Sequence, residues 1–123
     1  MEVGEIWRVR NKNKDINSYI FCITDILDTN HVTVNVMFRW TELAGPSDVK
    51  LPHSFIGSRV VFSFELECTI HVRHLDKLLY KLDSEQLDYI NKTTNVGPEY
   101  LDEYDVRYKY HEKIIEDMEG MQR

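Results

Sequence analysis

The stretch Ile70–Ile90, "IHVRHLDKLLYKLDSEQLDYI", changes its hydrophobic period part-way along. Its first residues alternate apolar and polar side chains, which is typical of a β-strand with one buried face. After Arg73 the apolar residues recur at intervals of three and four, which favours a helix, although a short helix followed by a strand is also allowed. We therefore expect a strand over Thr69–Arg73 and one or two helical turns over Leu75–Leu82.

The segments before this stretch are rich in Val, Ile, Phe, Tyr and Trp, and polar or Gly- and Pro-containing segments separate them. In the clearest segment every second residue from Val32 is apolar, so the intervening Asn35 and Met37 are expected to point outward. The run "YIFCI" is apolar on both faces, as in a central strand covered on each side. The sequence thus predicts a mainly β domain, with further strands over Glu5–Arg10, Tyr19–Leu27, Val32–Trp40 and Arg59–Leu66.

Helix signals follow the strands. Asp83 or Ser84 can accept hydrogen bonds from the first turn of a helix that contains "EQLDYI". Pro98 suits the first position of a later helix. The seam of that helix needs a partner, either the sheet of the same chain or a second chain, and it comprises Leu101, Tyr104, Tyr108, His111, Ile115 and Met118. We divide the chain into a barrel with its closing helix, 1–95, and an acidic helical extension, 96–123.

Composition places the chain among globular proteins of one domain. It has 123 residues, of which 42% are hydrophobic and 29% charged. Its longest apolar runs are too short to cross a membrane, so we expect a cytoplasmic protein. Cys22 and Cys68 lie in apolar strand-like runs, which indicates buried free thiols rather than a disulfide.

Charge is unevenly distributed. Residues 1–82 contain ten Lys and Arg against ten Asp and Glu, so the net charge of −6 resides wholly in residues 83–123. Within the neutral part, "RVRNKNK" holds four cations in seven residues with no acid among them, and a polyanion such as RNA would be attracted to it. An exposed, solvated turn explains the same pattern. The four cations are Arg8, Arg10, Lys12 and Lys14.

Four short motifs carry a family resemblance: "GEIWRVR", "VKLP", "VVFSFELECTI" and "LDKLLYKLDSEQLDYI". Over about residues 3–90 the chain resembles the PemK/MazF family of small toxin endoribonucleases. The resemblance implies a small SH3-like antiparallel barrel followed by two or three α-helices. It also implies cleavage of single-stranded RNA without a metal or other cofactor, an antitoxin protein as partner, and a homodimer.

The chain departs from the family at the catalytic position. Family members have an Arg-Pro pair leading into a strand, and this chain has "NKDINSYIFCI" there. Metal-free RNA cleavage needs a base, a cation and a proton donor. We therefore take Arg39, Thr41 and His71 as catalytic candidates, with His71 and Arg73 expected on one face of a strand. Phosphates would be held by Arg8, Arg10, Lys12, Lys14 and Arg73, and no metal ligand set is predicted.

Two other classes of function remain open. In one, the barrel is a non-catalytic binding module for a protein or nucleic acid, such as a phage or mobile-element effector that inhibits a host protein. In the other, the acidic extension imitates nucleic acid toward a basic partner or folds back as a lid over the chain's own basic loop. The partner-binding residues would then be Asp102, Glu103 and Asp105.

Overall fold

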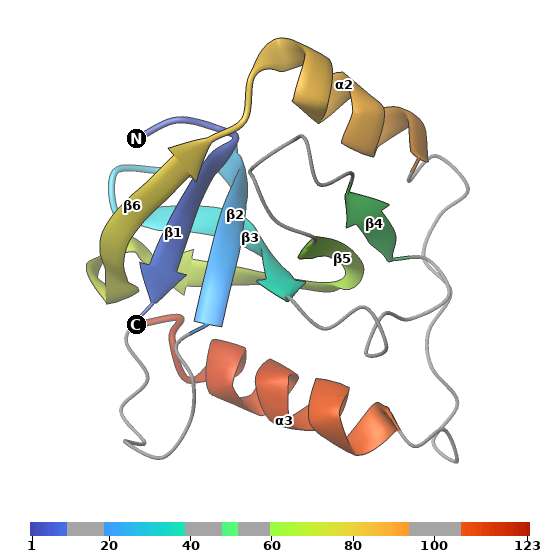
Figure 1. Cartoon of the computed structure of the whole chain (residues 1–123). Coiled ribbons are helices and arrows are strands. Elements are labelled where there is room, and N and C mark those ends of the chain that lie inside the picture. Colours follow the sequence, from blue (N-terminus) through green and yellow to red (C-terminus); the bar gives the residue numbers. More distant parts are fainter. Residues whose placement is uncertain (10–18, 39–47, 52–59, 94–106) are drawn as a thin grey trace.

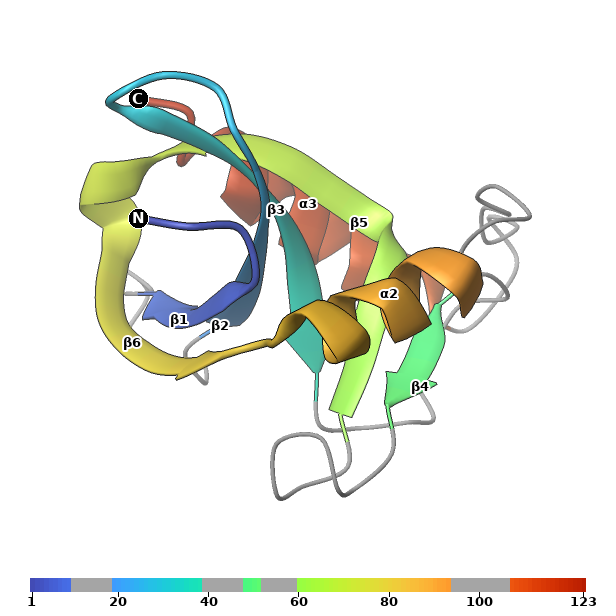
Figure 2. The same cartoon turned by 90° about the horizontal axis from the view of Figure 1, so that it is seen from above.

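The computed structural model describes residues 1–9, 19–38, 48–51, 60–93 and 107–123. Its strands form one six-stranded antiparallel sheet in the order β4-β5-β3-β2-β1-β6. The sheet is strongly curved and rolls into a small barrel (Figure 2), which confirms the predicted mainly β fold. The strands are β1 Glu5–Val9, β2 Tyr19–Ile26, β3 His31–Phe38, β4 Val49–Leu51, β5 Val60–His71 and β6 Leu75–Lys81.

Two described helices cover opposite sides of this sheet (Figure 1). α2, Ser84–Thr93, begins with a reciprocal cap in which the Gln86 amide N–H donates to the Asp83 carboxylate and the Asp83 N–H donates to the Gln86 side chain. α3, Tyr108–Glu119, packs against β5. The predicted helix after Asp83 and the C-terminal helix are both present. The proposed start of the latter at Pro98 lies outside the described residues.

The hydrophobic core is divided by the sheet into two clusters. Phe21 and Ile23 of β2 belong to the cluster that α3 completes with Ile114 and Met118. Cys22, between them, belongs to the cluster that Ile90 of α2 completes. Successive side chains of a strand point to opposite faces, so β2 is buried on both, as "YIFCI" predicted. Both cysteines are free thiols, as expected, but only Cys22 is buried and Cys68 is half-buried.

β5 unites two segments that the sequence separates. It runs from Val60 to His71 without a break, where two strands were expected. Its register with β3 slips between Asn35 and Met37, so that residues 63–66 lie opposite Val36. Such a bulge bends the strand and re-aims its side chains. The one bent strand therefore pairs with β4 through its first residues and with β3 on both sides of the bulge.

The prediction of helical turns over Leu75–Leu82 is wrong. Residues 75–81 form β6, an edge strand that pairs with β1. Leu78 and Leu79 are 46% and 43% exposed, so their helix-like spacing does not reflect a buried helical face. Pairing with the open edge of β1 satisfies the backbone of this segment and outweighs its local preference. β4 was also not expected, since it lies within a segment taken as a loop.

Two burial predictions are wrong as well. Asn35 and Met37 are buried, because the second half of β3 is covered on both faces. On α3, Ile114 is buried and Ile115 is 42% exposed, the reverse of the seam prediction. The helix meets the sheet through His111, Ile114 and Met118 at spacings of three and four. No described helix is long and apolar enough to cross a membrane.

Candidate functional site

One end of the barrel gathers several predicted site residues around the 3-10 helix η2, Val72–His74, which links β5 to β6. His71 ends β5 and pairs with His31, the first residue of β3. Leu75, the first residue of β6, pairs with Val9, the last residue of β1. The end of β1, which carries Arg8, therefore lies beside η2, and we call this region the η2 end.

His71 caps η2 with its side chain. Its Nδ1 atom accepts a hydrogen bond from the Arg73 backbone N–H at 3.0 Å. Burial, followed by electrostatic interaction with Arg73 and with the neighbouring imidazoles of His31 and His74, lowers the pKa of His71. The expectation that His71 and Arg73 share a strand face is wrong, because the chain leaves the strand at His71 and Arg73 lies in η2.

His31 lies against His71 at the same end. The two imidazole ring centroids are 5.2 Å apart and the ring planes meet at 75°. His31 Nδ1 lies 3.1 and 3.3 Å from the two carboxylate oxygens of Asp28. The sequence analysis did not select His31, because a histidine 40 residues from its partner carries no local signal.

Arg8 supplies the second described cation of the predicted phosphate site. Its guanidinium contacts Oδ2 of Asp76 at 2.9 and 3.3 Å, and its side chain is 46% exposed. Lys77 of β6 lies directly opposite Arg8 in the ladder. A phosphate arriving here would compete with one carboxylate for Arg8 and would meet Lys77 beside it.

The other predicted site residues lie outside the described residues, so their roles stay predictions. Arg39 directly follows Phe38, the last residue of β3, whereas His71 pairs with the first. Seven residue steps along a strand span about 23 Å. His71 therefore belongs to the opposite end of β3 from the residue that precedes Arg39. The undescribed candidates are Arg10, Lys12, Lys14, Arg39, Thr41, Asp102, Glu103 and Asp105.

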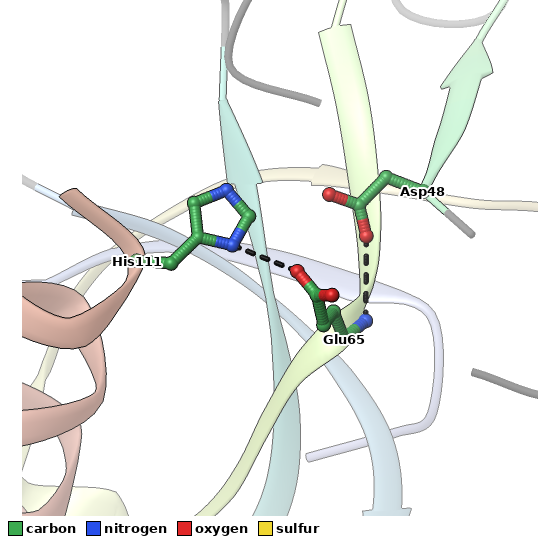
Figure 3. A group of neighbouring side chains, drawn as sticks. All are labelled: Asp48, Glu65 and His111. Carbon is green, nitrogen blue, oxygen red and sulfur yellow. Dashed lines mark hydrogen bonds and ion pairs between the residues drawn. The ribbon is translucent and has the colours of Figure 1, made fainter. Parts of the chain in front are cut away.

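A second cluster of titratable side chains lies beneath α3, in the bulge of β5. Glu65 and His111 have side chains 5% and 4% exposed, and His111 Nδ1 lies 2.8 Å from Oε2 of Glu65 (Figure 3). Asp48, just before β4, accepts hydrogen bonds from the Ser63 hydroxyl at 2.9 Å and the Glu65 N–H at 3.3 Å. The cluster thus joins β4, β5 and α3 at one point.

Hydrogen bonds continue from this cluster into the sheet. The Asn35 amide donates to the Ser63 carbonyl at 3.0 Å, and the Thr24 hydroxyl donates to the Asn35 side-chain oxygen at 2.9 Å. The buried amide of Asn35 therefore satisfies a carbonyl in the bulge. A polar network of this kind fixes one arrangement of the surrounding core.

Asp48, Glu65 and His111 also offer the ligand types that divalent metals bind, and their ligand atoms lie within 4.8 Å of one another. The described contacts, however, set the His111 imidazole against the Glu65 carboxylate and bond Asp48 to β5, and so fasten α3 to β5. No sequence motif marks this cluster, because its members come from three distant segments. We assign it an anchoring role.

A cavity opens next to the η2 end, between α3 and the sheet. Its volume is about 380 Å³. Thr33 and Thr69, which pair across β3 and β5, lie in its wall. Both are two residues from His31 and His71, so strand alternation puts all four side chains on one face of the sheet. The remaining lining residues are Glu67, Cys68, Ile115, Met118, Glu119 and Gln122.

Comparison with known proteins adds a fold relationship. The chain matches no protein-family model and no curated protein sequence. It superposes on a solved endoribonuclease in complex with its cognate antitoxin, from a mycobacterial species, with a TM-score of 0.61 and 14% sequence identity. The match covers 78% of this chain and 92% of that one. This chain has the fold of a toxin endoribonuclease. At this level of identity the relationship concerns the fold.

Proposed function

We propose that this chain is a toxin-type protein of the PemK/MazF kind that cleaves single-stranded RNA without a metal and is held in check by an antitoxin protein. The observation that supports the proposal most is the fold shared with an antitoxin-bound endoribonuclease. The gathering of Arg8, Arg73 and His71 at the η2 end supports it further, because these are side chains that bind phosphate.

In this proposal RNA phosphates lie along the η2 end. Arg73 and Arg8 contact them, and the run through Arg10, Lys12 and Lys14 extends the positive field. Two centres are candidates for the cleavage itself: His71 at the η2 end, and Arg39 with Thr41, which follow the last residue of β3 in the chain. They can be separated experimentally because Phe38 and His71 belong to opposite ends of β3.

The test is incubation of the purified protein with a long unstructured RNA in the presence of EDTA, followed by mapping of the cut sites. We expect cuts at short defined sequences. Arg39→Ala and His71→Gln are compared at equal RNA occupancy, and loss of the acting group should lower the rate by about 10²- to 10⁴-fold. Lys109→Ala, on the exposed side of α3, is the control. Absence of cleavage by the unaltered protein would refute the nuclease proposal.

A homodimer belongs to the same proposal. β6 is an edge strand whose outer surface carries the exposed apolar side chains Leu78, Leu79 and Tyr80. An edge strand of this kind is a ready surface for a second chain. Multi-angle light scattering of the protein and of Leu79→Lys tests it. Retention of a dimer by this variant would place the interface elsewhere.

The alternative is a non-catalytic module that binds a host protein, in the manner of a phage or mobile-element effector. The exposed side of α3 favours it, because Glu112, Glu116 and Glu119 outnumber Lys109 and Lys113 among its exposed charged residues. An acidic helix face attracts basic partners, and Asp102, Glu103 and Asp105 would extend it toward nucleic-acid mimicry. Binding of a basic partner that weakens steeply with salt, without RNA cleavage, would support this alternative.

A further inference from the structure

The paired histidines of the η2 end are held in opposite hydrogen-bonding states. His31 Nδ1 faces Asp28, and a carboxylate only accepts hydrogen bonds, so Nδ1 carries the proton in the neutral ring. Asp28 itself accepts from the backbone N–H groups of Asn30 and His31 at 2.7 and 2.8 Å, and these bonds lower its pKa. The Asp28 carboxylate therefore stays ionised at neutral pH and holds the proton of His31 on Nδ1. The lone pair on Nε2 of His31 is then available to accept a proton.

His71 has the opposite arrangement. Its Nδ1 accepts from the Arg73 N–H, so the proton of the neutral ring lies on Nε2. Its lowered pKa keeps the ring neutral at pH 7. A general base must accept a proton, and the Nε2 atom of His71 already carries one. His71 can instead donate a hydrogen bond from Nε2. A proton acceptor and a hydrogen-bond donor thus lie side by side, with ring centroids 5.2 Å apart.

We propose that His31 is the general base of RNA cleavage, oriented by Asp28, and that His71 donates a hydrogen bond from Nε2 to the scissile phosphate. This inference rests on the proposed nuclease function and assigns its proton acceptor. Arg73, adjacent to His71 in η2, adds positive charge next to the phosphate. Catalysis by hydrogen-bond donors aimed at developing charge needs this kind of fixed arrangement.

The reaction balances without a further reagent. The proton of the RNA 2′-hydroxyl moves to Nε2 of His31, the 2′-oxygen bonds to phosphorus, and the bond from phosphorus to the 5′-oxygen breaks. The leaving 5′-oxygen takes a proton from a water molecule, and the resulting hydroxide is neutralised by the proton on His31. The products are a 2′,3′-cyclic phosphate and a 5′-hydroxyl.

The adjoining cavity accounts for the rest of the nucleotide. Its volume of about 380 Å³ falls within the range of small-molecule pockets, and Thr33 and Thr69 join it to the histidine pair. Its two carboxylates, Glu67 and Glu119, repel phosphate and accept hydrogen bonds from amino groups of a base. A base in the cavity would put its neighbouring phosphate at the histidine pair.

The experiment compares single-turnover cleavage by the unaltered protein, His31→Gln, His31→Ala and His74→Gln. His74 is the matched control, because it lies at the same end and its Nε2 is 2.7 Å from the backbone oxygen of Arg123. Both His31 variants should lose about 100-fold or more in rate while binding a 2′-deoxy version of the RNA as tightly as before. Added imidazole should restore part of the His31→Ala rate, and His74→Gln should cleave normally.

The outcomes separate the two proposals. If the unaltered protein cleaves RNA and His31→Gln keeps more than half of its rate, the His31 assignment is overturned and the nuclease function stands. If His31→Ala is slow but imidazole restores nothing, His31 does not act as the proton acceptor, and its assignment as the base is overturned. If the unaltered protein does not cleave, both proposals fail. Thermal unfolding of each variant verifies that the barrel is intact.

Discussion

The phenolic hydroxyl of Tyr19 donates a 2.5 Å hydrogen bond to the carboxylate of Asp117 and so joins the start of β2 to α3. The Tyr19 ring is only 8% exposed and stacks on Phe21 at a centroid distance of 6.1 Å. Burial and then the bond to Asp117 raise the pKa of Tyr19. With the contact between Glu65 and His111, this bond fastens α3 to the sheet.

Removal of the Tyr19 hydroxyl should destabilise the protein. Tyr19→Phe keeps the ring and loses a hydrogen bond to a charged acceptor, so we expect a loss of about 1.5–3 kcal/mol in the free energy of unfolding. Because folding raises the pKa of Tyr19, its contribution is complete below about pH 10, the unfolded pKa, and is lost as pH rises above that value. Urea unfolding at pH 7 and pH 10.5 measures both effects. Equal differences at the two pH values would contradict the assignment.

Loss of His111 should cost more than loss of a surface histidine. His111→Leu removes the polar neighbour of a buried carboxylate, and we expect a decrease of about 3–5 kcal/mol in the free energy of unfolding. Replacing Glu65 by leucine as well should recover much of that loss, because no charge is then left at this position. His74→Gln serves as the control. A double variant no more stable than His111→Leu would argue against a stabilising contact between Glu65 and His111.

Gly4 is required by backbone geometry. Its φ is +94°, and a Cβ there would lie 3.1 Å from the Leu82 carbonyl oxygen and 3.2 Å from Leu87 Cδ1. Gly4→Ala should lower the free energy of unfolding by about 1–3 kcal/mol. Gly120, with φ −67° and no Cβ contact under 3.4 Å, is the matched control. Gly120→Ala should be neutral or stabilising by up to about 1 kcal/mol, as denaturant unfolding will show.

The two thiols should differ in reactivity. Burial raises the pKa of Cys22 to about 12, and its side chain is fully buried. Burial also raises the pKa of Cys68, which is partly exposed. At pH 8 an aromatic disulfide reagent should therefore label Cys68 slowly and Cys22 only after denaturation. Mass spectrometry of the labelled peptides checks the order, and early labelling of Cys22 would contradict it.

Arg73 should contribute to RNA binding by charge. Arg73→Ala should weaken binding of single-stranded RNA regardless of its sequence and reduce the slope of log K against log salt by about 0.7. Lys109→Ala should leave the slope unchanged. Fluorescence anisotropy over a salt series gives both slopes. Equal slopes for Arg73→Ala and the unaltered protein would remove Arg73 from the phosphate site.

The fold class, the strands from Tyr19 and Val32, the α2 cap at Asp83 and the acidic last third could all be predicted from the amino-acid sequence. These follow from alternation, capping and composition, which are local properties of the chain. The prediction failed for Leu75–Leu82, because this segment becomes a strand only by pairing with the open edge of β1, which is distant in the sequence.

Which distant residues come into contact depends on how the folded elements pack. His31 lies beside His71 because the β3–β5 register aligns residues 40 positions apart. Asp48, Glu65 and His111 meet because a bulge in β5 turns Glu65 toward α3. Register, bulges and helix docking arise from contacts distant in sequence, and no local pattern encodes them.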